Sequence, residues 1–198
     1  MLIKDVQKLI RCSSSLDRVF TLADLRLLYG DDSVATQFRK IEGLVKAGEL
    51  VKVKKGIYAR PDADLRGISQ RIDAESVVSL GTVLAEEGLI GSIPGKRVWA
   101  VRIGRPRRYS CELGVIEHLS ISPPLLFGWE WRDGCRRAVP EKAFLDAWYF
   151  QYKGRKLPFD LMEDVDVQRL DMGTVCAFLN KYERRFQTYL HSYLEGKL

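Results

Sequence analysis

Polar side chains recur at helical spacing in the first third of the chain, at positions i, i+3, i+4 and i+7. They are Ser33, Thr36, Gln37 and Lys40. Such a spacing puts hydroxyl, amide and ammonium groups on one face of a helix. These groups hydrogen-bond to base edges in the major groove of DNA. Cationic side chains that suit phosphate contacts accompany them: Arg39, Lys52, Lys54 and Lys55. The predicted chemistry is the non-covalent recognition of a DNA duplex.

The residues around this stripe predict a helix-turn-helix. Thr21 is suited to cap a first helix, with Asp24 at its third helical position. Gly30 lies in a predicted turn, where it is free to take a positive φ. Ser33 then caps a second helix, and Gly48 ends it. The turn therefore holds the polar stripe at the start of the second helix.

The rest of this region supplies a core and a basic hairpin. Four apolar residues of the second helix are expected to face inward: Val34, Phe38, Ile41 and Val45. Residues 50–53 and 57–59 predict two strands joined by Lys54-Lys55-Gly56, a wing with a cationic tip. An amphipathic helix over residues 1–12 completes a three-helix core. Residues 1–61 are thus predicted to form a winged helix-turn-helix domain.

Composition limits the remaining classes. The chain has 198 residues and a net charge of +6, and no stretch approaches the roughly twenty apolar residues of a membrane span. Charge returns at Lys4 before any apolar core forms, so no signal peptide is predicted and a cytoplasmic location is expected. Four scattered cysteines and two histidines give no zinc or disulfide pattern. We expect no metal and no cofactor.

A second basic run contains no acidic residue. Its members are Lys96, Arg97, Arg102, Arg105, Arg107 and Arg108. A basic run is usually only a solvated surface, but a second one behind a helix-turn-helix favours a polyanionic partner. Residues 97–103 combine basic and apolar side chains and predict a strand, and residues 105–108 predict a turn. We expect these cations to contact DNA or to support cooperative binding.

The second half of the chain predicts a small α+β domain. After a connector at residues 62–74, a domain at 75–198 is expected to hold a mixed or antiparallel sheet with helices. Helices are predicted at 75–90, from Pro140 to about 152, and at 172–194. Strands are predicted at 97–103, 115–121 and 125–131, with a short one at 136–139. The fold class is α+β.

Three constellations suggest other chemistry. Glu141, Lys142 and Asp146 are residue types of metal-dependent nucleases, but such a site needs them converging on a metal. Here they follow a helix start, which favours capping and packing. Neither histidine has neighbours that would complete a metal site. Trp129 and Trp131 share one predicted strand face and offer base stacking as an alternative to core packing.

Three strings resemble the AbiEi-type antitoxins of type IV toxin–antitoxin systems. They are Lys55 to Pro61, Val77 to Ile90 and Ala138 to Asp146, the last similar to a P-E-K-A-L-L-D helix start. The resemblance implies a repressor that binds inverted repeats in its own promoter through a winged helix. It also implies a functional partner, a nucleotidyltransferase-like toxin, without a stable complex between the two. No enzymatic activity is expected.

Two alternatives belong to other classes. A winged helix can position a DNA-acting enzyme such as a nuclease subunit, which needs a carboxylate cluster that the sequence does not supply. A protein-interaction module that neutralises a partner directly needs co-purification with that partner. The preferred hypothesis is a sequence-specific transcriptional repressor.

Overall fold

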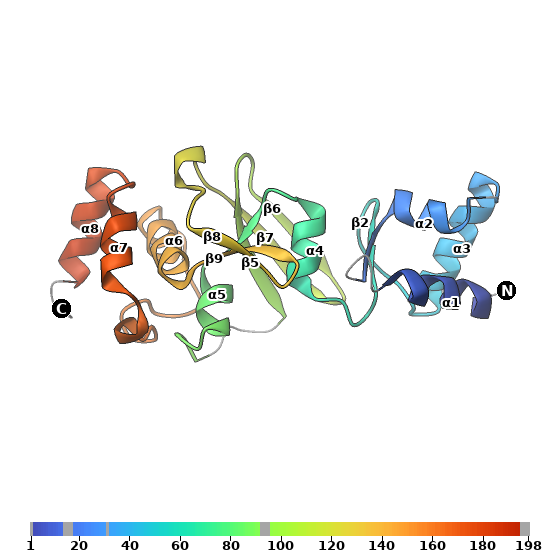
Figure 1. Ribbon diagram of the computed structural model, residues 1–198, viewed down its shortest axis with the longest axis horizontal. Helices are drawn as coiled ribbons and strands as arrows, with labels where there is room; N and C mark the ends of the chain where they lie inside the picture. The colour runs from blue at the N-terminus through green and yellow to red at the C-terminus, as the bar shows by residue number, and fades with distance from the viewer. Residues whose placement is uncertain (1, 14–17, 31, 92–95, 195–198) are drawn as a thin grey trace. The chain divides into compact units, whose positions relative to one another are not determined.

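The computed structural model describes residues 2–13, 18–30, 32–91 and 96–194, and the chain has the predicted α+β fold (Figure 1). It divides into two compact units. Unit 1 comprises Met1–Ala74 and Arg108–Ile116, and unit 2 comprises Glu75–Arg107 and Glu117–Leu198. The sequence-based division had placed residues 108–116 with the second domain.

Unit 1 begins with helices around an apolar core. Its elements to residue 74 are α1 (Leu2–Ser13), β1 (Val19–Thr21), α2 (Leu22–Leu28), α3 (Val34–Lys46), β2 (Val51–Lys54), β3 (Ile57–Ala59) and α4 (Leu65–Ile72). Thr21 caps α2 as predicted: its side chain accepts from the Asp24 N–H, and the Asp24 carboxylate accepts from the Thr21 N–H. Leu9 of α1, Leu25 of α2 and Leu44 of α3 meet in the core beneath them.

The predicted hairpin of unit 1 gains a third strand. The sheet has the order β1-β3-β2 and is antiparallel throughout. Gly56 takes a φ of +82° in the β2–β3 turn, where a side chain would be strained. A second apolar cluster combines Ile57 and Ile68 with Ile116, from the later segment of this unit. Strand β1 was not predicted, because three residues before a helix cap carry no strand periodicity.

Among the described residues, the second sheet has six strands and is mixed. Its strands are β4 (Val77–Val78), β5 (Arg97–Arg102), β6 (Arg107–Cys111), β7 (Gly114–Ser120), β8 (Trp129–Arg132) and β9 (Cys135–Ala138). They follow the order β6-β7-β5-β4-β9-β8. Strand β4 pairs antiparallel with β5 and parallel with β9, which confirms a mixed sheet.

Helices pack beside this sheet in unit 2. They are α5 (Gly81–Glu86), α6 (Pro140–Tyr152), α7 (Met172–Leu179) and α8 (Arg184–Leu194), with short 3-10 turns at Pro123–Leu125 and Val167–Arg169. Pro140 begins α6, as predicted from its fixed φ and missing N–H. Helices α7 and α8 both pack against α6 (Figure 1). This layer buries the middle of α6 completely.

Three sequence-based elements were wrong. The helix expected over residues 75–90 is β4 followed by α5, because Val77 and Val78 pair within the sheet and Leu80 takes a φ of +52°. The last helix is divided into α7 and α8, where Tyr182 turns its hydroxyl toward the Lys142 ammonium. The turn expected at residues 105–108 is shorter, since β6 already begins at Arg107.

The β8–β9 hairpin shows a turn signal that the sequence carried. Asp133 and Gly134 have φ values of +50° and +75°, and Arg132 pairs directly with Cys135. An Asp-Gly pair with two positive φ angles is a preferred two-residue hairpin turn. The strand expected at residues 125–131 begins only at Trp129, because Pro123–Leu125 form a 3-10 turn, and it ends at Arg132.

Candidate nucleic-acid interface

Helix α3 carries the predicted base-contacting residues, and its N-terminus is capped as expected. The Ser33 hydroxyl accepts from the Thr36 N–H at 3.3 Å. The helix packs against the rest of unit 1 through Gln37, Ile41 and Leu44, at i, i+4 and i+7. This buried face is rotated relative to the predicted one, and the rotation decides which side chains reach solvent.

Gln37 is a structural residue of the helix pair. Its side chain is 6% exposed, and its amide nitrogen donates to the Tyr29 carbonyl at 3.0 Å and to the Asp32 carbonyl at 3.2 Å. Its amide oxygen accepts from the Arg26 Nε at 3.0 Å. The donors and acceptor that would bond to a base are thus used to join α2, the turn and α3. The expectation that Gln37 lies on an exposed stripe was wrong.

Lys40 is held in a similar way. Its Nζ lies 2.7 Å from an Asp32 oxygen and 3.8 Å from an Asp5 oxygen, and 4.9 Å from the centre of the Tyr29 ring. Its hydrogen bond to Asp32 raises the pKa of the Lys40 ammonium. With 16% of the side chain exposed, Lys40 is bound to unit 1 rather than presented to a groove. Lys40 is therefore only partly accessible, and its charge is already paired.

Two apolar residues replace them at the surface. Val34 and Phe38 are 52% and 41% exposed, although the sequence pattern had placed them inside. The predicted inward face was correct for Ile41, which is buried, and for Val45, which packs against the core. It was wrong for Val34 and Phe38, and it omitted Leu44, whose spacing from Ile41 indicates the true phase. The exposed residues of α3 and its cap are Ser33, Val34, Ala35, Phe38, Arg39, Glu42 and Lys46. Of these, Ala35, Phe38, Arg39 and Glu42 form a stripe at i, i+3, i+4 and i+7.

Three accessible polar groups of α3 and its cap form a short chain in the N-terminal half of the helix. The hydroxyls of Ser33 and Thr36 are 2.9 Å apart, and the Arg39 guanidinium donates to the Thr36 hydroxyl at 3.3 Å. Ser33 and Arg39 are exposed, and Thr36 is half-buried. From the predicted stripe, therefore, Ser33 and Thr36 keep access to solvent, and Arg39 adjoins them instead of standing apart.

The lysines of the β2–β3 hairpin differ in their exposure to solvent. Lys52 and Lys55 are exposed, whereas Lys54 is half-buried and places its ammonium 5.9 Å from the centre of the Tyr109 ring. Arg60, which follows the hairpin, forms an ion pair with Glu49 at 2.6 Å. Lys52 and Lys55 are thus the hairpin cations best placed to meet a phosphate.

The second basic run is divided between structural and exposed members. In unit 2, Arg97 forms an ion pair with Glu117 at 3.3 Å, and Arg102 donates to the Arg105 carbonyl at 3.1 Å. The side chains that are exposed to solvent are Lys96, Arg105, Arg107 and Arg108. Arg108 belongs to unit 1, while the others belong to unit 2. The run is therefore not a single continuous set of free cations.

The residue types of a nuclease do gather in unit 2, but inside the protein. The Lys142 ammonium contacts the Asp146 carboxylate and donates to the Tyr182 hydroxyl at 3.0 Å. The Ser79 hydroxyl donates to the other Asp146 oxygen at 2.6 Å. Burial lowers the pKa of Lys142, with the Asp146 charge opposing that shift. Glu141 points elsewhere and accepts from the Asp171 N–H at 3.1 Å. The network joins elements of the core, and its four side chains are buried.

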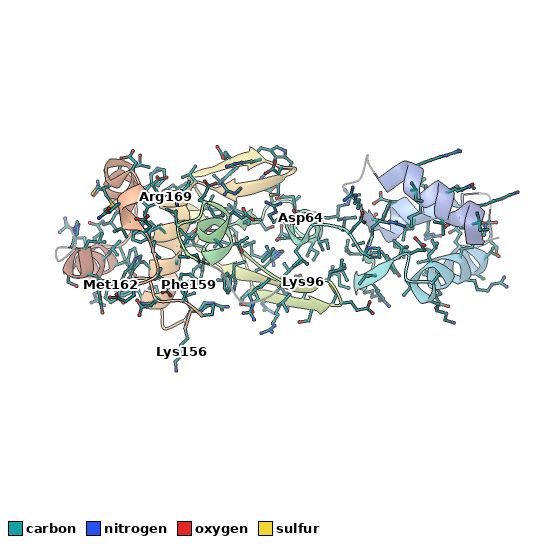
Figure 2. All side chains as sticks on the ribbon, turned by 90° about the horizontal axis from the view of Figure 1, so that it is seen from below. Asp64, Lys96, Lys156, Phe159, Met162 and Arg169 are labelled. Atoms are coloured by element: carbon teal, nitrogen blue, oxygen red, sulfur yellow. The ribbon has the colours of Figure 1, made fainter. Side chains whose placement is uncertain are left out.

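Other candidate sites are weaker still. Among the residues that the structure describes, no three histidine, cysteine, aspartate or glutamate side chains gather where they could hold a metal ion. A surface hollow of about 400 Å³ in unit 2 is bounded by Gln151, Arg155 and Asp160 among others. Figure 2 shows Lys156, at its rim, projecting away from the rest of the unit. Among the residues that line the hollow, none is a serine, threonine, cysteine or histidine.

Comparisons with known proteins add no assignment to these observations. A scan against protein-family models finds no match, and a search of curated proteins finds no similar sequence. In the described part of the chain, none of the helices has the length and apolar character needed to cross a membrane.

Proposed function

We propose that the chain is a sequence-specific DNA-binding repressor whose unit 1 acts as a winged helix-turn-helix. The observation that carries the proposal is the exposed stripe of α3, in which Arg39 lies beside the hydroxyls of Ser33 and Thr36. The succession of α2, turn, α3 and basic hairpin supports it. In such proteins the second helix enters the major groove and its N-terminal residues contact base edges.

The proposal assigns the side chains different roles from those expected from the sequence. Arg39, first expected at a phosphate, takes the base-edge role, because a guanidinium can form two hydrogen bonds to guanine. Ser33 and Thr36 remain base-edge candidates at the same end of α3. Lys52 and Lys55 contact phosphates. Gln37 and Lys40 hold the helix in place and do not touch DNA.

The biological setting follows from the resemblance to AbiEi-type antitoxins. We propose that the chain represses its own operon in the cytoplasm by binding inverted repeats in the promoter. Its functional partner would be a nucleotidyltransferase-like toxin that it opposes without a stable complex. No covalent step is involved, and the buried state of Lys142 and Asp146 supports a non-enzymatic role.

The test is selection of duplexes from a random pool with the full-length protein, followed by titration of the selected and a scrambled duplex. We expect a preference for the selected duplex. Arg39→Ala should reduce that preference by about 1–3 kcal/mol, the discrimination that a good bidentate base contact gives. Lys46→Ala, which removes an exposed charge further along α3, is the matched control. Failure to select any sequence would contradict the proposal.

A further inference from the structure

We infer that α3 recognises thymine methyl groups through Ala35 and Phe38, so that the bound sequence contains thymines at fixed positions in the major groove. The inference rests on the proposed function and specifies what that surface recognises. It begins from the unusual composition of the exposed stripe. A helix that only needs solvation would place polar side chains there.

The exposed stripe has an apolar part that the core does not use. Phe38 is 41% exposed and Ala35 is exposed. Val34, the first residue of α3, is 52% exposed. The buried face of α3 is already complete, with Gln37, Ile41 and Leu44 packed against unit 1. The apolar residues therefore remain available to a partner, and the buried amide of Gln37 does not compete with them.

DNA offers one apolar group in the major groove, the C5 methyl of thymine. Alanine and phenylalanine side chains are among those that contact it. Along the same stripe, Arg39 can donate to guanine, and Glu42 can accept from the amino group of cytosine. The stripe thus matches thymines next to a G·C pair.

The charges around the stripe favour DNA over a protein as the occupant. Arg39 is exposed on α3, and Lys52 and Lys55 are exposed on the following hairpin. DNA is a polyanion and neutralises these cations. Contact with the apolar patch of a second copy of the chain would instead bring two sets of like charges together. The apolar residues then supply sequence preference, and the surrounding cations supply affinity.

The experiment replaces single thymines by uracil in a duplex selected by the full-length protein. Uracil pairs as thymine does and lacks only the methyl group. We expect the Kd to rise about fourfold at one or two positions, as for the loss of one buried methyl group. At other positions in the duplex, uracil should have no effect. Equal binding of every uracil-substituted duplex would overturn the inference and leave the proposed function standing.

Variants assign the effect to α3. In Phe38→Ala, the thymine and uracil duplexes should bind equally at the position that Phe38 contacts, and any second sensitive position, contacted by Ala35, should keep its difference. Ile3→Ala, at an exposed apolar site on α1, should keep the fourfold difference. Circular dichroism checks folding, and the uracil scan of the unaltered protein does not depend on either variant. A change of oligomeric mass in Phe38→Ala with unchanged thymine preference would overturn the inference in favour of self-association.

A protein that selects no duplex at all would contradict the proposed function first. That outcome differs from one in which duplexes are selected but uracil is tolerated everywhere. The two failures are therefore distinguished in the same series of titrations.

Discussion

Helices α3 and α6 are both 13 residues long and both bury polar side chains, yet they use them differently. In α6, Lys142 and Asp146 are enclosed together with Phe144 and Trp148, within seven consecutive buried residues from Lys142 to Trp148. In α3, burial of Gln37 leaves apolar and cationic residues at the surface. A polar residue in a helix therefore does not by itself indicate the functional side. The face of the helix that is not buried in the core is the better indicator of the functional side.

The difference extends to electrostatics. The Lys142 ammonium lies 5.0 Å from the Phe127 ring and 5.5 Å from the Tyr182 ring, so aromatic side chains surround the ion pair. Burial also raises the pKa of the Tyr182 hydroxyl, which stays protonated beside Asp146. In unit 1 the corresponding ion pair of Lys40 with Asp32 lies nearer the surface. Removal of one partner of the ion pair should therefore lower the stability of the protein far more in α6 than in α3.

The largest expected effect is in α6. Asp146→Ala leaves the Lys142 ammonium buried without its counter-ion, which costs about 3–5 kcal/mol of unfolding free energy. Replacing both residues, as in Lys142→Met with Asp146→Leu, should restore much of that loss, because no buried charge remains. Urea unfolding followed by circular dichroism measures both. A loss below about 1 kcal/mol in Asp146→Ala would show that water reaches the pair.

A smaller effect is expected at Gln37 in α3. Gln37→Ala removes the side-chain hydrogen bonds to the Asp32 carbonyl and the Arg26 guanidinium and should cost about 1–3 kcal/mol of stability, although the Tyr29 carbonyl still accepts from the Asp32 N–H. The preference for a selected over a scrambled duplex should remain. Arg39→Ala is the converse control, with stability nearly unchanged and the preference reduced. Loss of sequence preference in a stably folded Gln37→Ala protein would restore the base-contact role that the sequence suggested.

The sequence predicted the local signals of these regions better than their tertiary environment. The caps at Thr21 and Ser33 and the start of α6 at Pro140 depend on residues a few positions apart, and all three were correct. The phase of α3 was not. The two candidate faces share Ile41, and only packing against α1 and α2 shows that Gln37 belongs inside. Side-chain periodicity cannot distinguish a glutamine that bonds to carbonyls from one that is solvated.

Sheet pairing was the other limit. Strands β1 and β4 have three and two residues, too few for a periodic pattern, and they exist because neighbouring strands supply hydrogen bonds. The Asp133-Gly134 turn, in contrast, was present in the sequence as a strong hairpin signal that was missed. Continuous burial of Val98 to Val101 in β5 likewise reflects its interior place in the sheet.

The basic hairpin allows a finer test of the same contrast, between a lysine that packs against the protein and one that is exposed to solvent. Lys55→Ala removes an exposed cation and should flatten the dependence of log Kd on log salt by about one unit. Lys54→Ala should change the slope less, since Lys54 lies over Tyr109. Titrations between low and moderate salt, on selected and scrambled duplexes alike, give the slopes. Identical slopes for Lys55→Ala and the unaltered protein would remove the hairpin tip from the interface.

The smallest effect concerns whether DNA contact extends beyond unit 1. Arg105 and Arg107 are exposed residues of unit 2, close together in the chain between β5 and the start of β6. Like charges so placed repel one another, and an anion relieves that repulsion. DNA that flanks the site bound by α3 is such an anion. In Arg105→Glu with Arg107→Glu, we therefore expect a shorter protected segment and independent occupancy of paired sites, with binding to a single short site nearly unchanged.

A charge-matched control separates this local effect from a general change in charge. Arg184→Glu with Arg185→Glu alters two exposed residues of α8, in the same unit, by the same total charge. Both proteins lose the same long-range attraction to DNA, so any difference between their footprints belongs to the position of the charges. Thermal melting confirms that both remain folded. If the two variants protect the same length of DNA, the exposed arginines of residues 105–107 are a solvated surface, and recognition is confined to unit 1.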